Sequence, residues 1–115
     1  MKKVLVLAGF LAVVLFFSNN IFAQKVFSVQ YESQAQVKVF VVSYESQADL
    51  CVYKEQYESQ AGINDGKWFF VDYESQAKKK IFFVDYESQA DLKIFFVDYE
   101  SQAGWRNKSK FATME

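Results

Sequence analysis

The stretch that decides the fold is Lys80-Ile81-Phe82-Phe83-Val84-Asp85-Tyr86-Glu87-Ser88-Gln89-Ala90, which recurs unchanged from Lys93 to Ala103. Its last five residues, Tyr-Glu-Ser-Gln-Ala, occur six times, beginning at Tyr31, Tyr44, Tyr57, Tyr73, Tyr86 and Tyr99. These copies are 13 residues apart, except that 16 residues separate the third copy from the fourth. Repeats this short cannot bury a core singly, so each unit must be stabilised by other units.

The repeats divide the 115-residue chain into three parts. Residues 1–23 precede the array, residues 24–103 hold six units that end at residues 35, 48, 61, 77, 90 and 103, and residues 104–115 form a C-terminal cap and polar tail. The extra residues lie in Gly62-Ile63-Asn64-Asp65-Gly66-Lys67, which is a strong turn signal and divides the array into two groups of three units. Trp105 is expected to cap the last unit, and the residues after it to be frayed.

Each unit has the pattern of a β-strand when Lys80 is taken as position one and Ala90 as position eleven. Position three is always aromatic, position five is valine in five units, and position seven is tyrosine. Positions one, six, eight and ten are mostly charged or polar. This alternation predicts an all-β protein in which positions three, five and seven face the core.

Two arrangements of such strands remain open, of which the first is preferred and the second is the alternative. In a small β-solenoid each unit is one coil, and equivalent residues stack at about 4.8 Å. In an antiparallel β-meander or sandwich each unit is one strand, and Ser-Gln-Ala with the next residue forms a hairpin loop. The uniform Tyr-Glu-Ser-Gln-Ala segment favours the solenoid, whereas stacking six glutamates argues against it.

Residues 1–23 have the pattern of a secretory signal peptide, with Lys2 and Lys3 followed by an apolar run from Val4 to Phe17. Cleavage after Ala23 would export the protein to the periplasm or the extracellular space, with no membrane span left; an uncleaved membrane anchor is the alternative. Without this segment the chain has 11 basic and 14 acidic residues, which argues against a nucleic-acid partner. Cys51 is the only cysteine and is expected to be a small buried side chain.

The repeated pattern Val/Ile-Phe-Phe-Val-Asp-Tyr-Glu-Ser-Gln-Ala-Asp, with Ala103-Gly104-Trp105 before a basic tail, resembles a family of short secreted bacterial proteins of unknown function. Related repeat proteins occur in some eukaryotes. The resemblance implies no catalytic residues, because that family has no assigned activity. The third unit departs from the pattern at Cys51, Lys54 and Glu55, so its packing is expected to be irregular.

Composition and motifs favour a non-catalytic protein. The chain has no histidine, which removes the commonest general base and metal ligand. The leading hypothesis is a binding or structural module of the bacterial envelope or secretome, with a glycan, an envelope component or a second copy as partner. At position four, outward-facing Phe70, Phe83 and Phe96 would form an interaction surface, unless a terminal segment or second sheet covers them.

Two other functions rest on carboxylates. Stacked pairs would offer oxygen ligands to Ca²⁺, although a solvated acidic face neutralised by the repeat lysines is the simpler interpretation. The ligands would be Asp72, Glu74, Asp85, Glu87, Asp98 and Glu100. A glycosidase-like enzyme is the weakest hypothesis, because it needs two carboxylates in unlike environments and a repeat gives every pair nearly the same one.

Overall fold

The computed structural model describes residues 23–115, so the predicted signal peptide lies outside the described residues apart from Ala23. The described residues form seven short strands: β1 (Lys25–Ser28), β2 (Val37–Val41), β3 (Leu50–Lys54), β4 (Lys67–Phe70), β5 (Lys79–Phe83), β6 (Leu92–Phe96) and β7 (Gly104–Trp105). Single 3₁₀ turns follow the first six strands: η1 (Glu32–Gln34), η2 (Glu45–Gln47), η3 (Glu58–Gln60), η4 (Glu74–Gln76), η5 (Glu87–Gln89) and η6 (Glu100–Gln102). A longer 3₁₀ helix, η7 (Lys108–Met114), ends the chain. No helix in this part of the protein is long and apolar enough to cross a membrane.

Each unit supplies one strand and one corner. Valine, isoleucine and phenylalanine favour the extended strand, and the Glu-Ser-Gln segment then makes one 3₁₀ turn. In the fifth unit the Gln89 amide donates to the Tyr86 carbonyl and the Ala90 amide to the Glu87 carbonyl, both at 3.1 Å. Tyr86 before this turn and Ala90 after it are extended, so the chain changes direction sharply between two strands.

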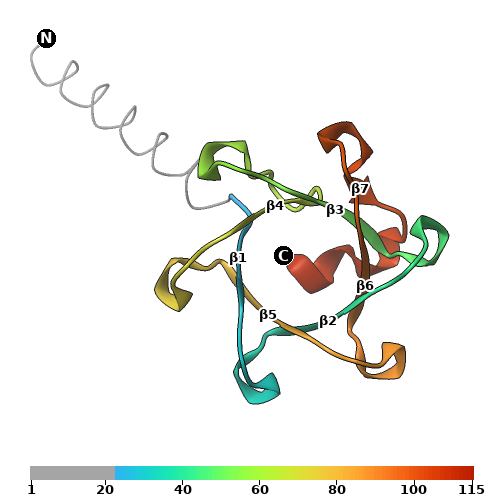
Figure 1. Cartoon of the computed structure of the whole chain (residues 1–115), viewed down its shortest axis with the longest axis horizontal. Coiled ribbons are helices and arrows are strands. Elements are labelled where there is room, and N and C mark those ends of the chain that lie inside the picture. Colours follow the sequence, from blue (N-terminus) through green and yellow to red (C-terminus); the bar gives the residue numbers. More distant parts are fainter. Residues whose placement is uncertain (1–22) are drawn as a thin grey trace, which may run out of the picture.

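The strands form a closed ring in the order β4-β1-β5-β2-β6-β3, and β3 also pairs with β4 (Figure 1). All six are parallel to their neighbours, and only β7 pairs antiparallel, with β3. Strands β1, β2 and β3 alternate round the ring with β4, β5 and β6. The chain therefore winds twice round one axis, and the second lap of three units fills the gaps between the strands of the first.

Each repeat strand pairs with two strands of the other lap, one along its first half and one along its second half. The first half of β2, from Val37 to Val39, pairs with β5, whereas its second half, from Val39 to Val41, pairs with β6. In the first, second and fifth units a side-chain oxygen at position twelve accepts a hydrogen bond from the amide at position one of a unit in the other lap. Three such bonds are 2.9 Å long, from Lys38 to Asp91, from Lys93 to Asp49 and from Lys80 to Gln36.

In the link between the laps, a different residue supplies the oxygen that accepts the bond from the amide at position one. Gly62 stands at position twelve of the third unit and has no side chain to accept a bond. The Asp65 carboxylate occupies the space that a Cβ on Gly62 would need, and it accepts from the Lys67 amide at 3.2 Å. Asn64 and Gly66 have positive φ angles of 52° and 87°, so the link bends tightly enough to return Asp65 to that place.

The core inside the ring comes from positions two and thirteen, so the predicted inward set of positions three, five and seven is wrong. Position two is fully buried in all six units: Val26, Val39, Val52, Trp68, Ile81 and Ile94. The aromatic residues at position three are half-buried on the outer face, where Phe40 and Phe95 pack in a separate cluster with Val42, Ala48 and Cys51. Both faces of the strand are apolar because parallel strands are covered on both sides.

The all-β repeat prediction is confirmed, but neither predicted arrangement describes the ring. The antiparallel meander is wrong, because the six repeat strands pair only in parallel. Consecutive units of one lap also do not lie side by side as the coils of the small β-solenoid would, since a strand of the other lap separates them; β3 and β4, where the laps join, are the consecutive strands that pair directly. A narrow coil has one inner face to bury, whereas these strands have two.

The C-terminal segment is part of the core. Helix η7 runs into the centre of the ring (Figure 1), and Met114 is fully buried there. The Gln24 side chain donates to the Met114 carbonyl at 3.3 Å, and the Trp105 and Phe111 rings lie 5.7 Å apart. The expectation of a frayed end is therefore wrong, because η7 buries Met114 in the ring and brings Phe111 against Trp105.

Phe70, Phe83 and Phe96 share the inward parity of position two and do not form an outward row. All three are half-buried and pack against the central cluster at the C-terminal ends of their strands. The Lys54 ammonium lies 4.4 Å from the centre of the Phe96 ring and 5.6 Å from that of Phe70. These rings close the end of the ring opposite to Met114, and Lys54 makes a cation–π contact with two of them.

Replacing Met114 tests whether η7 holds the core together. Met114→Ala should lower the free energy of unfolding by about 2–5 kcal/mol, because it leaves a cavity among fully buried side chains. Urea unfolding measures the change, and Lys110→Ala on the exposed side of the same helix is the control. Equal stability of the two variants would show that the C-terminal segment is dispensable.

Candidate functional site

The six corners are the most exposed regular feature of the protein. Each presents Tyr-Glu-Ser-Gln at the periphery of the ring (Figure 1), and the six tyrosines are 62–69% exposed. The tyrosine is at the start of the turn, where its side chain makes no capping hydrogen bond. The prediction that position seven is buried is thus wrong, because position seven is where the chain leaves the strand for the corner.

Every corner glutamate is paired with a cation. In the regular units it reaches the lysine at position one of the next unit, and the nitrogen–oxygen distances are 3.5 Å for Glu32–Lys38, 3.3 Å for Glu74–Lys80 and 3.4 Å for Glu87–Lys93. At the ends of the laps the partner comes from the first unit of the same lap. Glu58 pairs with Lys25 at 3.1 Å and Glu100 with Lys67 at 3.9 Å. The corners consequently carry balanced charge.

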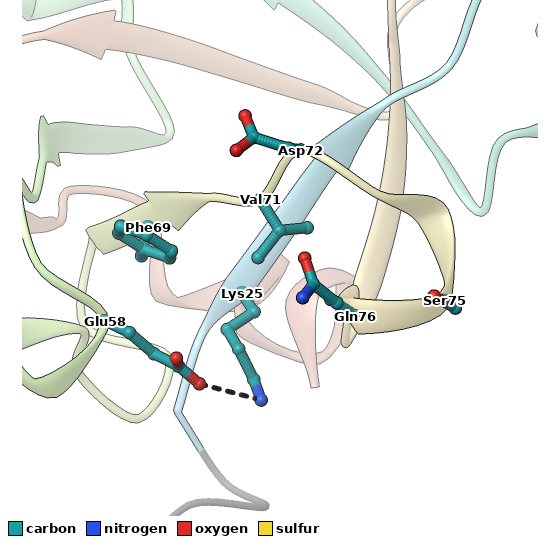
Figure 2. A pocket seen from close by; sticks show the side chains of 7 residues that line it. All are labelled: Lys25, Glu58, Phe69, Val71, Asp72, Ser75 and Gln76. Carbon is teal, nitrogen blue, oxygen red and sulfur yellow. Dashed lines mark ion pairs between the residues drawn. The ribbon is translucent and has the colours of Figure 1, made fainter.

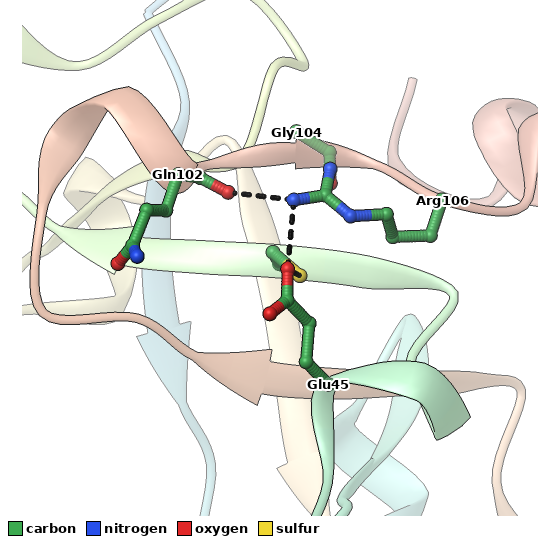
Figure 3. A network of polar contacts seen from close by, with 5 residues as sticks. Glu45, Gln102, Gly104 and Arg106 are labelled. Atoms are coloured by element: carbon green, nitrogen blue, oxygen red, sulfur yellow. Dashed lines mark hydrogen bonds and ion pairs between the residues drawn. The ribbon is translucent and has the colours of Figure 1, made fainter.

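The sixth glutamate, Glu45, shows how the array compensates for an irregular residue. Its expected partner at position one of the third unit is Cys51, and Arg106 takes the place of the missing lysine at 3.0 Å (Figure 3). The Cys51 thiol donates to the same carboxylate oxygen at 3.7 Å. Burial raises the pKa of Cys51, and the Arg106 charge opposes this rise. Cys51 is fully buried, as the sequence predicted.

Glu55 is a buried carboxyl group in the third unit. It takes the place of the valine at position five, is only 6% exposed, and its Oε1 atom has no hydrogen-bond partner. Burial, followed by the nearby Glu100 carboxylate, raises the pKa of Glu55. Strand β3 nevertheless keeps its register with β6. The expected irregularity of this unit is therefore a buried carboxyl group and not a distorted strand.

The carboxylate pairs predicted as calcium ligands do not form a ladder. Their strands β4, β5 and β6 are separated in the ring by β1 and β2, and the glutamate of each pair has a lysine partner. Residues 23–115 contain no group of three or more acidic, cysteine or histidine residues able to hold a metal ion. Cation binding by single pairs remains a prediction. The residues concerned are Asp72, Glu74, Asp85, Glu87, Asp98 and Glu100, all exposed.

A model of the 7(1) septoil knot domain matches residues 23–106, well over half of the chain. The chain belongs to this family. The match supports the expected resemblance at the level of a repeat domain, and the path of the chain fits the description, because a second lap woven through the first is how a two-lap knot is built. No curated protein and no solved structure matches the chain.

The sequence held signals for features that the strand prediction missed. Position two is apolar in every unit, which fixes the inward face and places the tyrosine outside the core. Arg106 follows Trp105 in the register of a seventh unit, where position one holds a cation. Its pairing with Glu45 across 61 residues required the closed ring, which repeat spacing alone does not predict.

Glu55→Val should stabilise the protein at pH 7 by about 1–3 kcal/mol, because it removes a buried polar atom without a partner. The folded-state pKa of Glu55 lies above its unfolded value of 4.5, so the folded state keeps the proton longer. Stability of the wild type should therefore fall as pH rises from about 4.5 through the raised pKa.

Urea unfolding at pH 4 and pH 7 tests this prediction. The gain from Glu55→Val should shrink at pH 4, which lies below both the unfolded and the folded pKa of Glu55, so that the protonated form predominates in both states. Glu32→Gln, at an exposed corner, is the control and should change stability little. A gain of equal size at both pH values would contradict the assignment to the buried carboxylate.

Proposed function

We propose that the protein is a non-catalytic binding module of the bacterial envelope or secretome, whose six corners engage a repetitive envelope glycan. The observation that carries this proposal is the exposure of the six tyrosines, 62–69%, on a closed scaffold. Large amphipathic rings that lie outside the core give contact area at low entropic cost. The segment from residue 1 to residue 23 is the support for export.

Variation among the units separates the corners from the scaffold. Position four is Ser28, Val41 or Lys54 in the first lap and phenylalanine in the second, and position two includes valine, isoleucine and Trp68. Recent duplication alone would leave these positions as uniform as the corners. The exposed Tyr-Glu-Ser-Gln segment is identical in all six units, although little of it is buried. We attribute this uniformity to a function of the exposed corner residues, because packing of the core does not require it.

The charges at the six corners bear on which class of partner the corners can bind. Each corner glutamate is paired with a lysine or arginine within 4 Å, so the corners carry no basic patch for nucleic acid. Tyrosine rings stack on sugar faces, and glutamate and glutamine bond sugar hydroxyls. Self-association through strand edges is disfavoured, because each of β1–β6 already pairs on both sides.

Six equivalent corners also suit a polymer better than a small molecule. Contacts that are individually weak gain affinity when several engage one chain, by a factor of about 10²–10⁴ for two linked sites. Catalysis finds less support, since the chain has no histidine and the corner carboxylates share one environment.

A variant with all six tyrosines replaced by alanine tests the proposal. It should fold, because these side chains lie outside the buried clusters, and should lose at least about tenfold in binding to purified peptidoglycan sacculi in a sedimentation assay. The matched control replaces Ser33, Ser46, Ser59, Ser75, Ser88 and Ser101 by alanine at the same six corners. Absence of wild-type binding, or unchanged binding by the tyrosine variant, would refute the proposal.

A further inference from the structure

A polar pocket lies where the first lap closes and the second begins. Its volume is about 420 Å³, within the range of about 300–1,000 Å³ for ligand pockets. Lys25 of β1, Glu58 of η3 and Phe69 of β4 line it, together with Val71, Asp72 and Gln76 on the segment that follows β4 (Figure 2). Three separate parts of the chain thus meet at this seam.

The pocket follows the longer link between the third and fourth units. Val71, at position five, is half-buried there, as Val97 is in the last unit, whereas Val29, Val42 and Val84 are buried. Glu58 pairs with Lys25 of the first unit, as Glu100 pairs with Lys67 in the second lap. Phe69 and Val71 are therefore partly accessible on the outer face beside the Lys25–Glu58 pair.

We infer that this pocket binds one unit of a neutral saccharide. Val71 lies between Asp72 and the Lys25–Glu58 pair, and the Phe69 ring lies to one side of it, above Glu58 in this view (Figure 2). Such a surface offers an apolar contact for a sugar ring. Carboxylate oxygens of Glu58 and Asp72 accept bonds from sugar hydroxyls, and the Gln76 amide both donates and accepts.

Charged ligands fit this lining less well. An anion would meet two carboxylates, and the one ammonium, Lys25, is already paired with Glu58 at 3.1 Å. A divalent cation would find no set of three ligands, because the described residues hold none and Val71 lies between the two carboxylates. Neutral hydroxyl groups are the ligands that satisfy both carboxylates without adding charge.

The inference deepens the proposed glycan-binding function, but the site is distinct from the tyrosine corners. Soluble disaccharides test it alone, since one ligand cannot bridge corners. Titration of the wild type with maltose, cellobiose and N,N′-diacetylchitobiose should shift the backbone NMR signals of Phe69, Val71 and Asp72 at millimolar concentration for at least one sugar. Signals of the equivalent residues Phe82, Val84 and Asp85 should not move.

The repeat supplies matched variants. Asp72→Asn combined with Gln76→Ala should weaken the responsive sugar at least fivefold, whereas Asp85→Asn with Gln89→Ala, the same changes at a regular corner, should leave the affinity unchanged. No shift with any of the three sugars, or equal losses in both variants, would overturn the pocket assignment. If no sugar binds the pocket but the wild type binds sacculi and the six-tyrosine variant does not, the tyrosine corners remain the proposed binding surface. If a sugar binds the pocket but the corner test fails, only the proposal for the corners is refuted.

Discussion

The constraint on which the structure depends is that each repeat strand finds its hydrogen-bond partners in the other lap. Strand β2 pairs with β5 and β6 and not with β1 or β3, and the same holds round the ring until β3 meets β4. Three units alone would leave every strand with open edges. The second lap closes all of them, at the cost of non-local contacts, which slow folding, and of a threaded path, which is rare among proteins.

Strand content, unit boundaries and the division into two groups of three follow from the sequence, because each rests on local spacing. Which side of each strand faces the core does not follow from the sequence. Ile81, Phe82, Phe83 and Val84 form a continuous apolar run, so an inner face at the even positions and one at the odd positions both fit it. The tyrosine at position seven extended the odd alternation and suggested the wrong inner face. A run of this kind between charged ends indicates a parallel strand covered on both sides, and Ile81 and Val84 are buried on opposite faces.

Two irregular positions are compensated by residues that lie outside the six units. Arg106 replaces the lysine that Cys51 displaces, and Asp65 replaces the side chain that Gly62 lacks. Sequence spacing predicts neither, because the first contact spans 61 residues and the second depends on the bend at Asn64 and Gly66. Glu55 has no comparable compensation within its unit, and its carboxyl group is left partly unsatisfied.

The same constraint determines where function can reside. The inner faces of the strands pack in one buried cluster that includes Met114, and Phe70, Phe83 and Phe96 pack against it at the strand ends. Exposed chemistry is found at the corners, which are identical, and at the seam near Lys25 and Glu58. Identical sites raise avidity for a repeating polymer without distinguishing its sugars. In the proposed function, selectivity therefore comes from the seam pocket, whose lining is mixed.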